Sequence, residues 1–358
     1  MANFDSIFKN KKVFLTGHTG FKGSWMSVWL SMLGANVRGY ALKPEKISLY
    51  IQVQNKLKNH KSVIADIRNK KRLEKEILDF QPDFIFHLAA QPLVLESYKN
   101  PVETFEVNVI GTANLLDSVK GLKKKCSVVV VTTDKVYKNI EKKYAYKESD
   151  KLGGYDPYSA SKAAAEIITS SYRQSIFNPA DYVKHKKAIA TARAGNVIGG
   201  GDYAENRIVP DVFRALSNSK NINVRNPKAV RPWQHVLEPL HGYLTLAAAM
   251  HKQPQKFATS FNFGPKLKDT CAVEDLVKLA IKKWGNGNYK TPQQKGAPHE
   301  AGLLMLNIDK AKQHLNWQPQ WSASIAISKT MDWYKQSVSK KVEVMDLCVG
   351  NINEYCKK

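Results

Sequence analysis

A chain of 358 residues with 43% hydrophobic content is long and apolar enough for a globular protein with a sizeable core. No apolar run approaches the roughly 20 residues that cross a bilayer, and residues 1–14 do not resemble a secretory signal, so we expect a cytoplasmic protein without a membrane partner. The formal charge of +24 would suit a nucleic-acid surface. However, only nine of the 55 basic residues are arginine and the lysines are scattered, so we expect no nucleic-acid partner.

Short apolar runs alternate with longer helical stretches through the first half of the chain. Strands are predicted at 12–15, 36–41, 84–88, 127–131 and 188–194, and helices at 23–33 and from about 157. This alternation predicts an α/β fold with a doubly wound parallel sheet. We divide the chain into a dinucleotide-binding domain, 1–195 with 232–262 returning to it, and a smaller C-terminal substrate-binding α/β region, mostly 196–358.

A glycine loop follows the first predicted strand and opens the next helix. Gly17, Gly20 and Gly23 permit a tight turn and close approach of the backbone to a pyrophosphate, which the helix N-terminus attracts. We therefore predict a dinucleotide site here, with Phe21 and Lys22 taking part. His18 either contacts a cofactor phosphate or fills the turn.

The G-x-x-G-x-x-G spacing of this loop resembles the extended branch of the short-chain dehydrogenase/reductase superfamily. The resemblance implies a Rossmann-type sheet and NAD as cofactor. In that family an acidic residue after the second strand usually holds the adenosine ribose, but Lys43 lies in this zone, so NADP is not excluded. The resemblance implies further cofactor contacts from Asp66, Ile67, Leu88, Ala89, Ala90, Gln91 and Thr132.

Tyr158 and Lys162 lie four residues apart and so share one face of a helix. Asp156 and Pro157 supply an N-cap and a first-turn residue, so we predict that this helix begins here. A cation beside a phenol lowers its pKa, which makes Tyr158 a base for a hydroxyl proton while hydride leaves for nicotinamide. Lys162 is also expected to hold the cofactor ribose.

Polar residues follow the apolar run 128–131, at the carboxyl end of a strand, where ligands bind in open α/β sheets. Thr133 followed by Asp134 and Lys135 resembles the nucleotide-sugar 4,6-dehydratases, whereas many epimerases of this branch have small residues there. Once C4 of the sugar is oxidised, elimination of water needs a base at C5 and an acid at the C6 hydroxyl. We assign Asp134 as the acid and Lys135 as the base, with Thr133 in the catalytic set.

Lysine at the second of these positions resembles the CDP-glucose branch of the dehydratases, and similar segments run from about residue 9 to about 335. The resemblance implies that Asn196, Arg207 and Arg231 face the substrate diphosphate, which suits the planar donor fork of arginine. His235 is either a packed histidine or a substrate contact. The four cysteines lack the spacing of metal ligands, so no metal is expected.

The implied reaction is dehydration of CDP-glucose to CDP-4-dehydro-6-deoxyglucose with NAD as a recycled hydride carrier. The resemblance also implies a homodimer through helices near 105–120 and 158–175, and a product for deoxysugar synthesis in surface polysaccharide such as O antigen. One alternative is another nucleotide-sugar 4,6-dehydratase or a 4-epimerase, and Asp134-Lys135 argues against the epimerase. A non-enzymatic binding protein is the second alternative, and the intact Thr133, Tyr158 and Lys162 argue against it.

Overall fold

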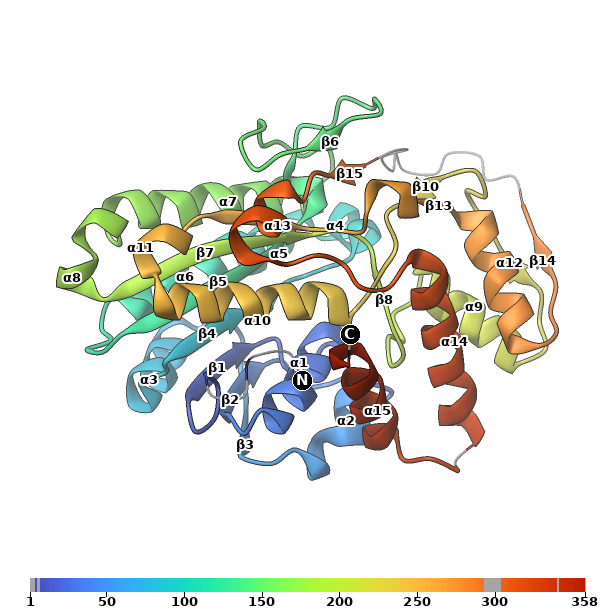
Figure 1. The fold of residues 1–358 in the computed structure, drawn as a ribbon, viewed down its shortest axis with the longest axis horizontal. Coiled ribbons are helices and arrows are strands. Elements are labelled where there is room, and N and C mark those ends of the chain that lie inside the picture. The colour runs from blue at the N-terminus through green and yellow to red at the C-terminus, as the bar shows by residue number, and fades with distance from the viewer. Residues whose placement is uncertain (1–3, 5–6, 293–303, 340, 358) are drawn as a thin grey trace.

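A seven-stranded sheet forms the centre of the computed structural model, which describes residues 4, 7–292, 304–339 and 341–357 (Figure 1). The strand order is β3-β2-β1-β4-β5-β7-β12, and every neighbouring pair is parallel. This order confirms the predicted doubly wound sheet, because its direction reverses between β1 and β4. The strands are β1 (Lys12–Thr16), β2 (Asn36–Ala41), β3 (His60–Ile64), β4 (Phe84–His87), β5 (Cys126–Thr133), β7 (Lys187–Ala194) and β12 (Ser260–Phe263).

Helices cover both faces of the sheet, because successive strand side chains point to opposite sides. Phe14 and Val128 belong to the core on one face, whereas Val13 and Val129 belong to the core on the other. The first face is covered by α3 (Lys70–Phe80), α6 (Gly111–Val119) and α7 (Pro157–Ser175), and the second by α1 (Phe21–Met32) and α10 (Leu237–Lys252).

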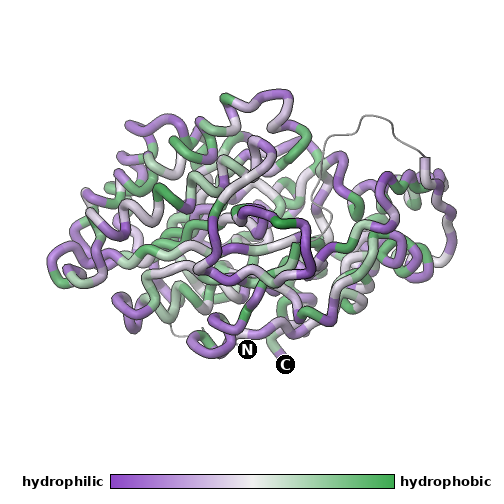
Figure 2. The backbone as a smooth tube through the Cα atoms, turned by 90° about the horizontal axis from the view of Figure 1, so that it is seen from above, coloured by the Kyte–Doolittle hydropathy of each residue, from purple (hydrophilic) through white to green (hydrophobic). Residues whose placement is uncertain are grey.

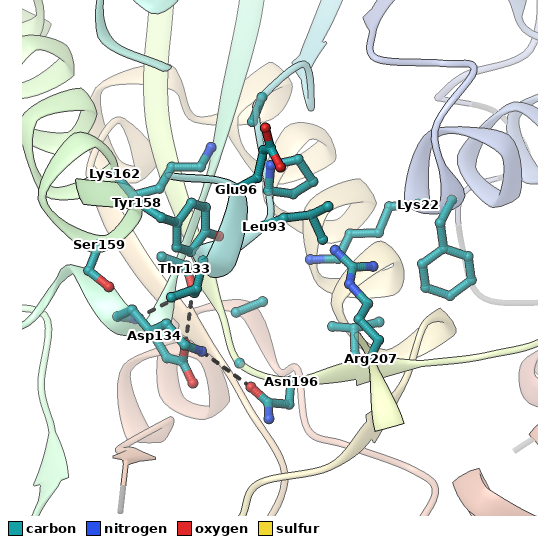
Figure 3. A pocket seen from close by; sticks show the side chains of 18 of the residues that line it. Lys22, Leu93, Glu96, Thr133, Asp134, Tyr158, Ser159, Lys162, Asn196 and Arg207 are labelled. Carbon is teal, nitrogen blue, oxygen red and sulfur yellow. Dashed lines mark hydrogen bonds and ion pairs between the residues drawn. The ribbon is translucent and has the colours of Figure 1, made fainter. Parts of the chain in front are cut away.

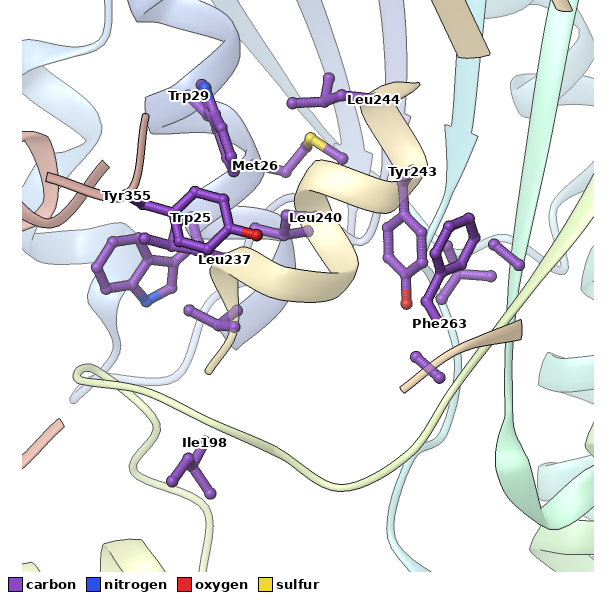
Figure 4. Packing of buried hydrophobic residues seen from close by; sticks show 14 of the residues in the cluster. Trp25, Met26, Trp29, Ile198, Leu237, Leu240, Tyr243, Leu244, Phe263 and Tyr355 are labelled. Atoms are coloured by element: carbon purple, nitrogen blue, oxygen red, sulfur yellow. The ribbon is translucent and has the colours of Figure 1, made fainter. Parts of the chain in front are cut away.

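The larger core lies on the α10 side of the sheet, and Figure 4 shows its packing. Leu240 and Leu244, one helical turn apart, face Met26 and Trp29 of α1. All four side chains are at most 2% exposed. This packing holds α1 against the sheet and so fixes the helix end that follows the glycine loop.

A second region of smaller elements lies beside the sheet (Figure 1, right). It contains α9 (Ile208–Ser217), α12 (Val273–Trp284), α14 (Ala323–Ser339) and short sheets such as β10 (Val230–Arg231) with β13 (Cys271–Ala272). Between these elements the chain returns to the large sheet, where β12 pairs with β7. The division at residues 195, 232 and 262 stays a prediction.

Two strands extend further at their carboxyl ends than the sequence predicted. β1 continues to Thr16, and β5 continues to Thr133 because this residue pairs with Ala194 of β7. α1 begins at Phe21 rather than at Gly23. The longer strands bring polar side chains to the edge of the sheet at which ligands bind in such folds.

Hydrophilic residues concentrate in the peripheral loops, and hydrophobic stretches run through the interior (Figure 2). No helix in the described part of the chain is long and apolar enough to cross a membrane. In the same part, no group of three or more His, Cys, Asp or Glu side chains has the arrangement of a metal site. The four cysteines are free.

Candidate functional site

A cavity of about 1080 Å³ lies where the parallel strands end, between the sheet and the second region. Its walls come from residues at or just after the ends of β1, β4, β5 and β7, and from the segment that leads into α9. Figure 3 shows Tyr158 and Lys162 on one side of this cavity, with Lys22 and Arg207 on the other. Residues predicted from separate sequence motifs therefore meet in one place.

Two of the three glycines in the loop after β1 leave no room for a side chain. Gly17 has a left-handed backbone with φ of +75°, and a Cβ there would lie 2.7 Å from a backbone nitrogen of the loop after β4. A Cβ at Gly23 would lie 2.0 Å from the Gly17 carbonyl oxygen. α1 has Gly20 as its N-cap, and the N–H groups of its first turn lack partners within the helix. This loop, with Phe21 and Lys22 on the cavity wall, fits a dinucleotide pyrophosphate.

The predicted adenosine end of the site lies near β2 and β3. Asp66 and Ile67 line the cavity, and a side-chain hydrogen bond from Arg68 holds the pKa of Asp66 below its usual value. Lys43 is exposed and does not line the cavity. The structure thus leaves the Lys43 side chain in solvent at the β2 end of the site, apart from the wall that Asp66 and Ile67 form.

Buried polar groups support the loop after β4. Thr16 Oγ1 accepts the backbone N–H groups of Leu88 and Ala89, each at 3.1 Å, and donates to His87 Nδ1 at 2.7 Å. Burial lowers the pKa of His87 to about 3, so the ring is neutral and its other nitrogen donates to Thr112. Leu88, Ala89 and Ala90 line the cavity as a wall of uncharged residues.

α7 begins at Pro157, as its predicted cap requires. The Asp156 carboxylate accepts the Ser159 N–H at 2.9 Å and the Ser159 hydroxyl at 2.6 Å. Because the helix starts there, Tyr158 and Lys162 lie one turn apart and both line the cavity.

The surroundings of Tyr158 differ from those predicted. Lys162 donates to the Val131 carbonyl at 3.1 Å, and burial lowers its pKa to about 8. Burial raises the pKa of Tyr158. The positive charge of Lys135 and a hydrogen bond with Thr133 lower this pKa, but by less than burial raises it. The expectation that Lys162 gives Tyr158 a lowered pKa is therefore wrong, and Lys135 is the cation that opposes burial most strongly.

The end of β5 brings three polar side chains beside Tyr158. Asp134 is 1% exposed and accepts a hydrogen bond from the Thr133 hydroxyl at 2.9 Å. Lys135 Nζ lies 3.4 Å from Asp134 Oδ1 and 3.3 Å from Asn196 Oδ1. An acid and an amine thus meet on the cavity wall within hydrogen-bonding distance, which suits proton transfer.

Two arginines enter the cavity from the second region. Arg207 immediately precedes α9 and pairs with Asp202 at 2.9 Å, and Arg231 lies in β10. Lys22 lies near Arg207, and burial together with Arg207 and Lys162 lowers the pKa of Lys22 to about 7. This concentration of cations suits an anionic ligand such as a diphosphate.

Three predicted site residues lie outside the cavity wall. The His18 ring is buried behind the glycine loop, where Nε2 contacts Ser62 Oγ at 2.7 Å, so it fills the turn. The Gln91 side chain donates to a backbone carbonyl two residues away at 3.1 Å. His235 is 1% exposed and packs against two tryptophans, and burial lowers its pKa to about 3. In the structure these three side chains thus have packing or hydrogen-bonding roles behind the wall, and their predicted ligand contacts stay predictions.

Several supporting residues were missed in the sequence. Asn108, in the π-helical segment η2 (Glu106–Ile110), donates to Ser161 on α7 at 2.9 Å and also contacts the loop after β4. Ser97 Oγ accepts the Tyr158 N–H at 3.1 Å. The partners lie 53 and 61 residues apart in the chain, so local patterning carried no signal for them.

Comparison with known proteins places the chain among nucleotide-sugar enzymes. The family model for GDP-mannose 4,6 dehydratase matches residues 14–330. A CDP-glucose 4,6-dehydratase of Salmonella typhimurium is 44% identical over 333 residues, which are 92% of each chain. A CDP-paratose 2-epimerase of Salmonella typhi is 27% identical and covers 90% of this chain and 98% of the relative.

Solved structures share the fold. The dTDP-glucose 4,6-dehydratase of Bacillus anthracis, in complex with NAD, has a TM-score of 0.76 at 21% identity, covering 92% of this chain and 98% of its own. DesIV, a dTDP-glucose 4,6-dehydratase from Streptomyces venezuelae with NAD and TYD bound, has the same TM-score at 22% identity and the same coverage. At these identities the likeness concerns the architecture of the chain, and it agrees with the predicted Rossmann-type sheet.

Proposed function

The chain belongs to the GDP-mannose 4,6 dehydratase family, and we propose that it is a hydro-lyase that converts CDP-glucose to CDP-4-dehydro-6-deoxyglucose. The Salmonella CDP-glucose 4,6-dehydratase supports this nucleotide and this sugar, because it is 44% identical over 92% of the chain. The product is a precursor for deoxysugar synthesis, and incorporation into a surface polysaccharide belongs to the same proposal.

The observation that carries this proposal is the contact between Asp134 and Lys135. A 4,6-dehydration needs an acid and a base side by side, because the proton at C5 and the hydroxyl at C6 leave from adjacent carbons. The 3.4 Å separation of the two side chains on the cavity wall, close to Tyr158, meets that need. A 4-epimerase has no use for such a pair.

NAD fits the first half of the cavity. The glycine loop and the first turn of α1 would hold its pyrophosphate, Asp66 its adenosine, and Lys162 its nicotinamide ribose. When bound, NAD would supply the hydride transfer from C4 of the sugar to C6.

Tyr158 is the proposed base for the C4 hydroxyl. Burial keeps the phenol protonated, and the charges of Lys135 and Arg207 oppose this effect and favour the phenolate. Thr133 hydrogen-bonds Tyr158 and also donates to Asp134, so it connects the two groups. The proton taken by Tyr158 thereby has a path to Asp134 at the end of each turnover.

Asp134 is the proposed acid that protonates the C6 hydroxyl, which leaves as water, and Lys135 removes the C5 proton. Their reactive forms are a carboxylic acid and a neutral amine. These forms differ from the ion pair by one proton moved across the 3.4 Å contact. Lys135 then returns its proton to C5.

Arg207 and Arg231 are the proposed partners of the substrate diphosphate, with Asn196 beside them. All three line the cavity on the side of the second region. The Asp202 carboxylate orients the Arg207 guanidinium, which keeps its remaining N–H groups for the ligand.

We further propose a cytoplasmic homodimer. Val102, Ile110 and Ile167 are 70%, 52% and 58% exposed, and they lie on the adjacent elements α5 (Pro101–Phe105), η2 and α7. A second copy that covers these elements would remove this apolar surface from water. Four free cysteines suit a reducing compartment.

Mass spectrometry of reactions with CDP-, dTDP-, UDP- and GDP-linked sugars, with and without added NAD, tests the proposal. Among these nucleotide sugars, we expect that only CDP-glucose loses one molecule of water. Loss of water from a different nucleotide sugar would keep the mechanism and overturn the specificity. If protein with bound NAD removed water from none of these sugars, the dehydratase assignment would be overturned.

A further inference from the structure

A buried ion pair lies behind the cavity wall, between α7 and β7. Glu166 Oε2 and an Arg193 guanidinium nitrogen are 2.8 Å apart, and their side chains are only 2% and 4% exposed. Neither residue lines the cavity. Burial of two charges is costly, and an apolar pair of similar volume often stabilises a fold at least as much as a buried ion pair does. Stability alone therefore gives little reason for an ion pair at this position.

The Glu166 carboxylate is tied to the strand that carries the proposed catalytic residues. It accepts hydrogen bonds from the Thr132 hydroxyl at 2.5 Å and the Thr191 hydroxyl at 2.8 Å. Thr132 immediately precedes Thr133, at the end of β5. Glu166 also lies one helical turn after Lys162, so it joins α7 to β5 close to the site.

The Arg193 guanidinium reaches the other end of the same segment. It donates to the Tyr137 hydroxyl at 2.8 Å, and its central carbon lies 5.0 Å from the Tyr137 ring centroid. The Tyr137 hydroxyl in turn donates to Asn262 Oδ1 at 2.7 Å. The ion pair thus anchors Thr132 and Tyr137, the residues that flank 133–136.

We infer that Glu166 and Arg193 are positioning residues for the proposed dehydration: they clamp both ends of the segment that carries Asp134 and Lys135, and Glu166 places a buried carboxylate one helical turn from Lys162. The inference rests on the proposed function for its kinetic consequences. Its electrostatic part concerns the protein alone.

The charges around Lys162 support the electrostatic part. Burial lowers the pKa of Lys162 to about 8, and Glu166 is the group that opposes this shift. Lys22 faces Lys162 from α1, and His87 faces it from β4 as a neutral ring, because burial lowers the pKa of His87 to about 3. Although burial opposes it, Arg193 holds the pKa of Glu166 below its usual value, so the carboxylate stays charged.

Further charged groups face the outer side of the ion pair. Arg173 of α7 interacts with both Glu166 and Arg193, and burial lowers its pKa. Lys310 lies near Arg193 and Glu148. None of these groups takes the place of Glu166 beside Lys162. Once this carboxylate is removed, burial and the repulsion of Lys22 therefore lower the pKa of Lys162 without opposition from Glu166.

The first experiment titrates Lys162 directly, by NMR of protein labelled with ¹³C-lysine, with K162M to assign the signal. We expect E166Q to shift the Lys162 midpoint from about 8 to a lower pH by roughly one unit or more. A folded E166Q protein with an unchanged midpoint would overturn the electrostatic part.

The second experiment measures turnover of CDP-glucose by Y137F, which removes the Tyr137 hydrogen bonds to Arg193 and Asn262 and leaves both charges in place. We expect kcat to fall about 10-fold to 100-fold with little change in KM, because a small misplacement of reacting groups is costly. The Lys162 midpoint should not move. A wild-type kcat would overturn the clamp, and it would do so even where E166Q does not fold.

E76Q is the matched control. Glu76 forms another shielded ion pair, with Arg38 at 3.2 Å, between α3 and β2 and outside the cavity wall. We expect E76Q to lower stability while kcat, KM and the Lys162 midpoint stay at wild-type values. If the wild-type protein turned over no nucleotide sugar, the proposed function would fail, and the NMR titration would still decide the electrostatic part.

Discussion

At the scale of single residues, the proposed reaction depends on where protons reside among Tyr158, Thr133, Asp134 and Lys135. Thr133 contacts both Tyr158 and Asp134, and Asp134 contacts Lys135, so the four side chains form one continuous hydrogen-bonded path. The sequence predicted these residue types and their order. Which cation acts on the phenol depends on side-chain direction, and Lys162 points its ammonium to the Val131 carbonyl.

Tyr158→Phe tests the proposed base. We expect kcat to fall about 100-fold to 10,000-fold, because a positioned proton acceptor contributes that much. NAD binding should persist, since the glycine loop and Lys162 are unchanged. Turnover by mass spectrometry and NAD binding by calorimetry check both expectations. Tyr172→Phe, on the same helix but outside the cavity wall, should behave as wild type.

Lys135→Ala tests the proposed C5 base. The variant should bind NAD, and its rate of water elimination should fall by a factor of about 100 to 10,000. Hydride uptake from C4 should be slowed less, because Tyr158 and Thr133 remain. The measurement is water loss from CDP-glucose, with Lys151→Ala at an exposed position as the control. Normal turnover by Lys135→Ala would remove this residue from the mechanism.

At the scale of elements, α7 and β5 together decide the geometry of the site. The Asp156 cap starts α7 at a position that brings Tyr158 and Lys162 to the cavity, and local sequence was enough to predict it. The end of β5 was predicted two residues too early, because its last residues are held by pairing with β7, a partner about 60 residues away in the chain. A helix cap is local, whereas a strand end depends on its neighbour.

Asp156→Ala should destabilise the fold by about 1 kcal/mol, the usual cost of losing an N-cap acceptor. The two hydrogen bonds from Ser159 would be lost with the carboxylate. Urea unfolding measures the change in the free energy of unfolding. Asp156→Asn keeps an acceptor oxygen and should retain most of the stability. Equal stability of Asp156→Ala and wild type would show that the cap contributes nothing.

At the scale of the whole molecule, the cavity exists because segments from both halves of the chain close around the strand ends. The C-terminal helix α15 (Val344–Cys356) returns to α1, where Tyr355 donates to the buried Glu238 at 2.6 Å. Glu238 also accepts the backbone N–H groups of Gln320 and Trp321. This carboxyl joins the end of the chain to α10. Because it is buried, its contribution to the stability of the fold depends on pH.

Glu238→Gln tests that dependence. Burial raises the pKa of Glu238 to about 7 from an ordinary 4.5, so the folded state holds a proton that the unfolded chain releases. The stabilising contribution is present below about pH 4.5 and is lost as the pH rises through about 7. Glutamine does not titrate and can donate to Tyr355. The unfolding free energy of the variant minus that of wild type should therefore increase by roughly 2 kcal/mol between pH 5 and pH 8.

Urea unfolding at both pH values measures this gain. Glu343→Gln, at an exposed position, should show the same difference from wild type at pH 5 and at pH 8. A pH-independent difference for Glu238→Gln would mean that the carboxyl is ionised throughout.

Ile167→Asp tests the proposed dimer. Ile167 is 58% exposed on α7, and a charge there would be buried at the proposed interface. We expect the molar mass from light scattering to fall from two chains to one. Val183→Asp, at a 79% exposed position on α8 (Tyr182–His185), should leave the mass unchanged. A dimeric Ile167→Asp protein would place the interface elsewhere.

The sequence by itself determined the alternating fold, the glycine loop and the start of α7. Each of these depends on neighbours within a few residues, because turn geometry, helix capping and periodicity are local. Only the tertiary structure decided that His18, Gln91 and His235 turn away from the cavity, and that Glu166 and Arg193 meet behind it. Those outcomes depend on which side chains become neighbours once distant segments pack and water is excluded, and no local pattern encodes that.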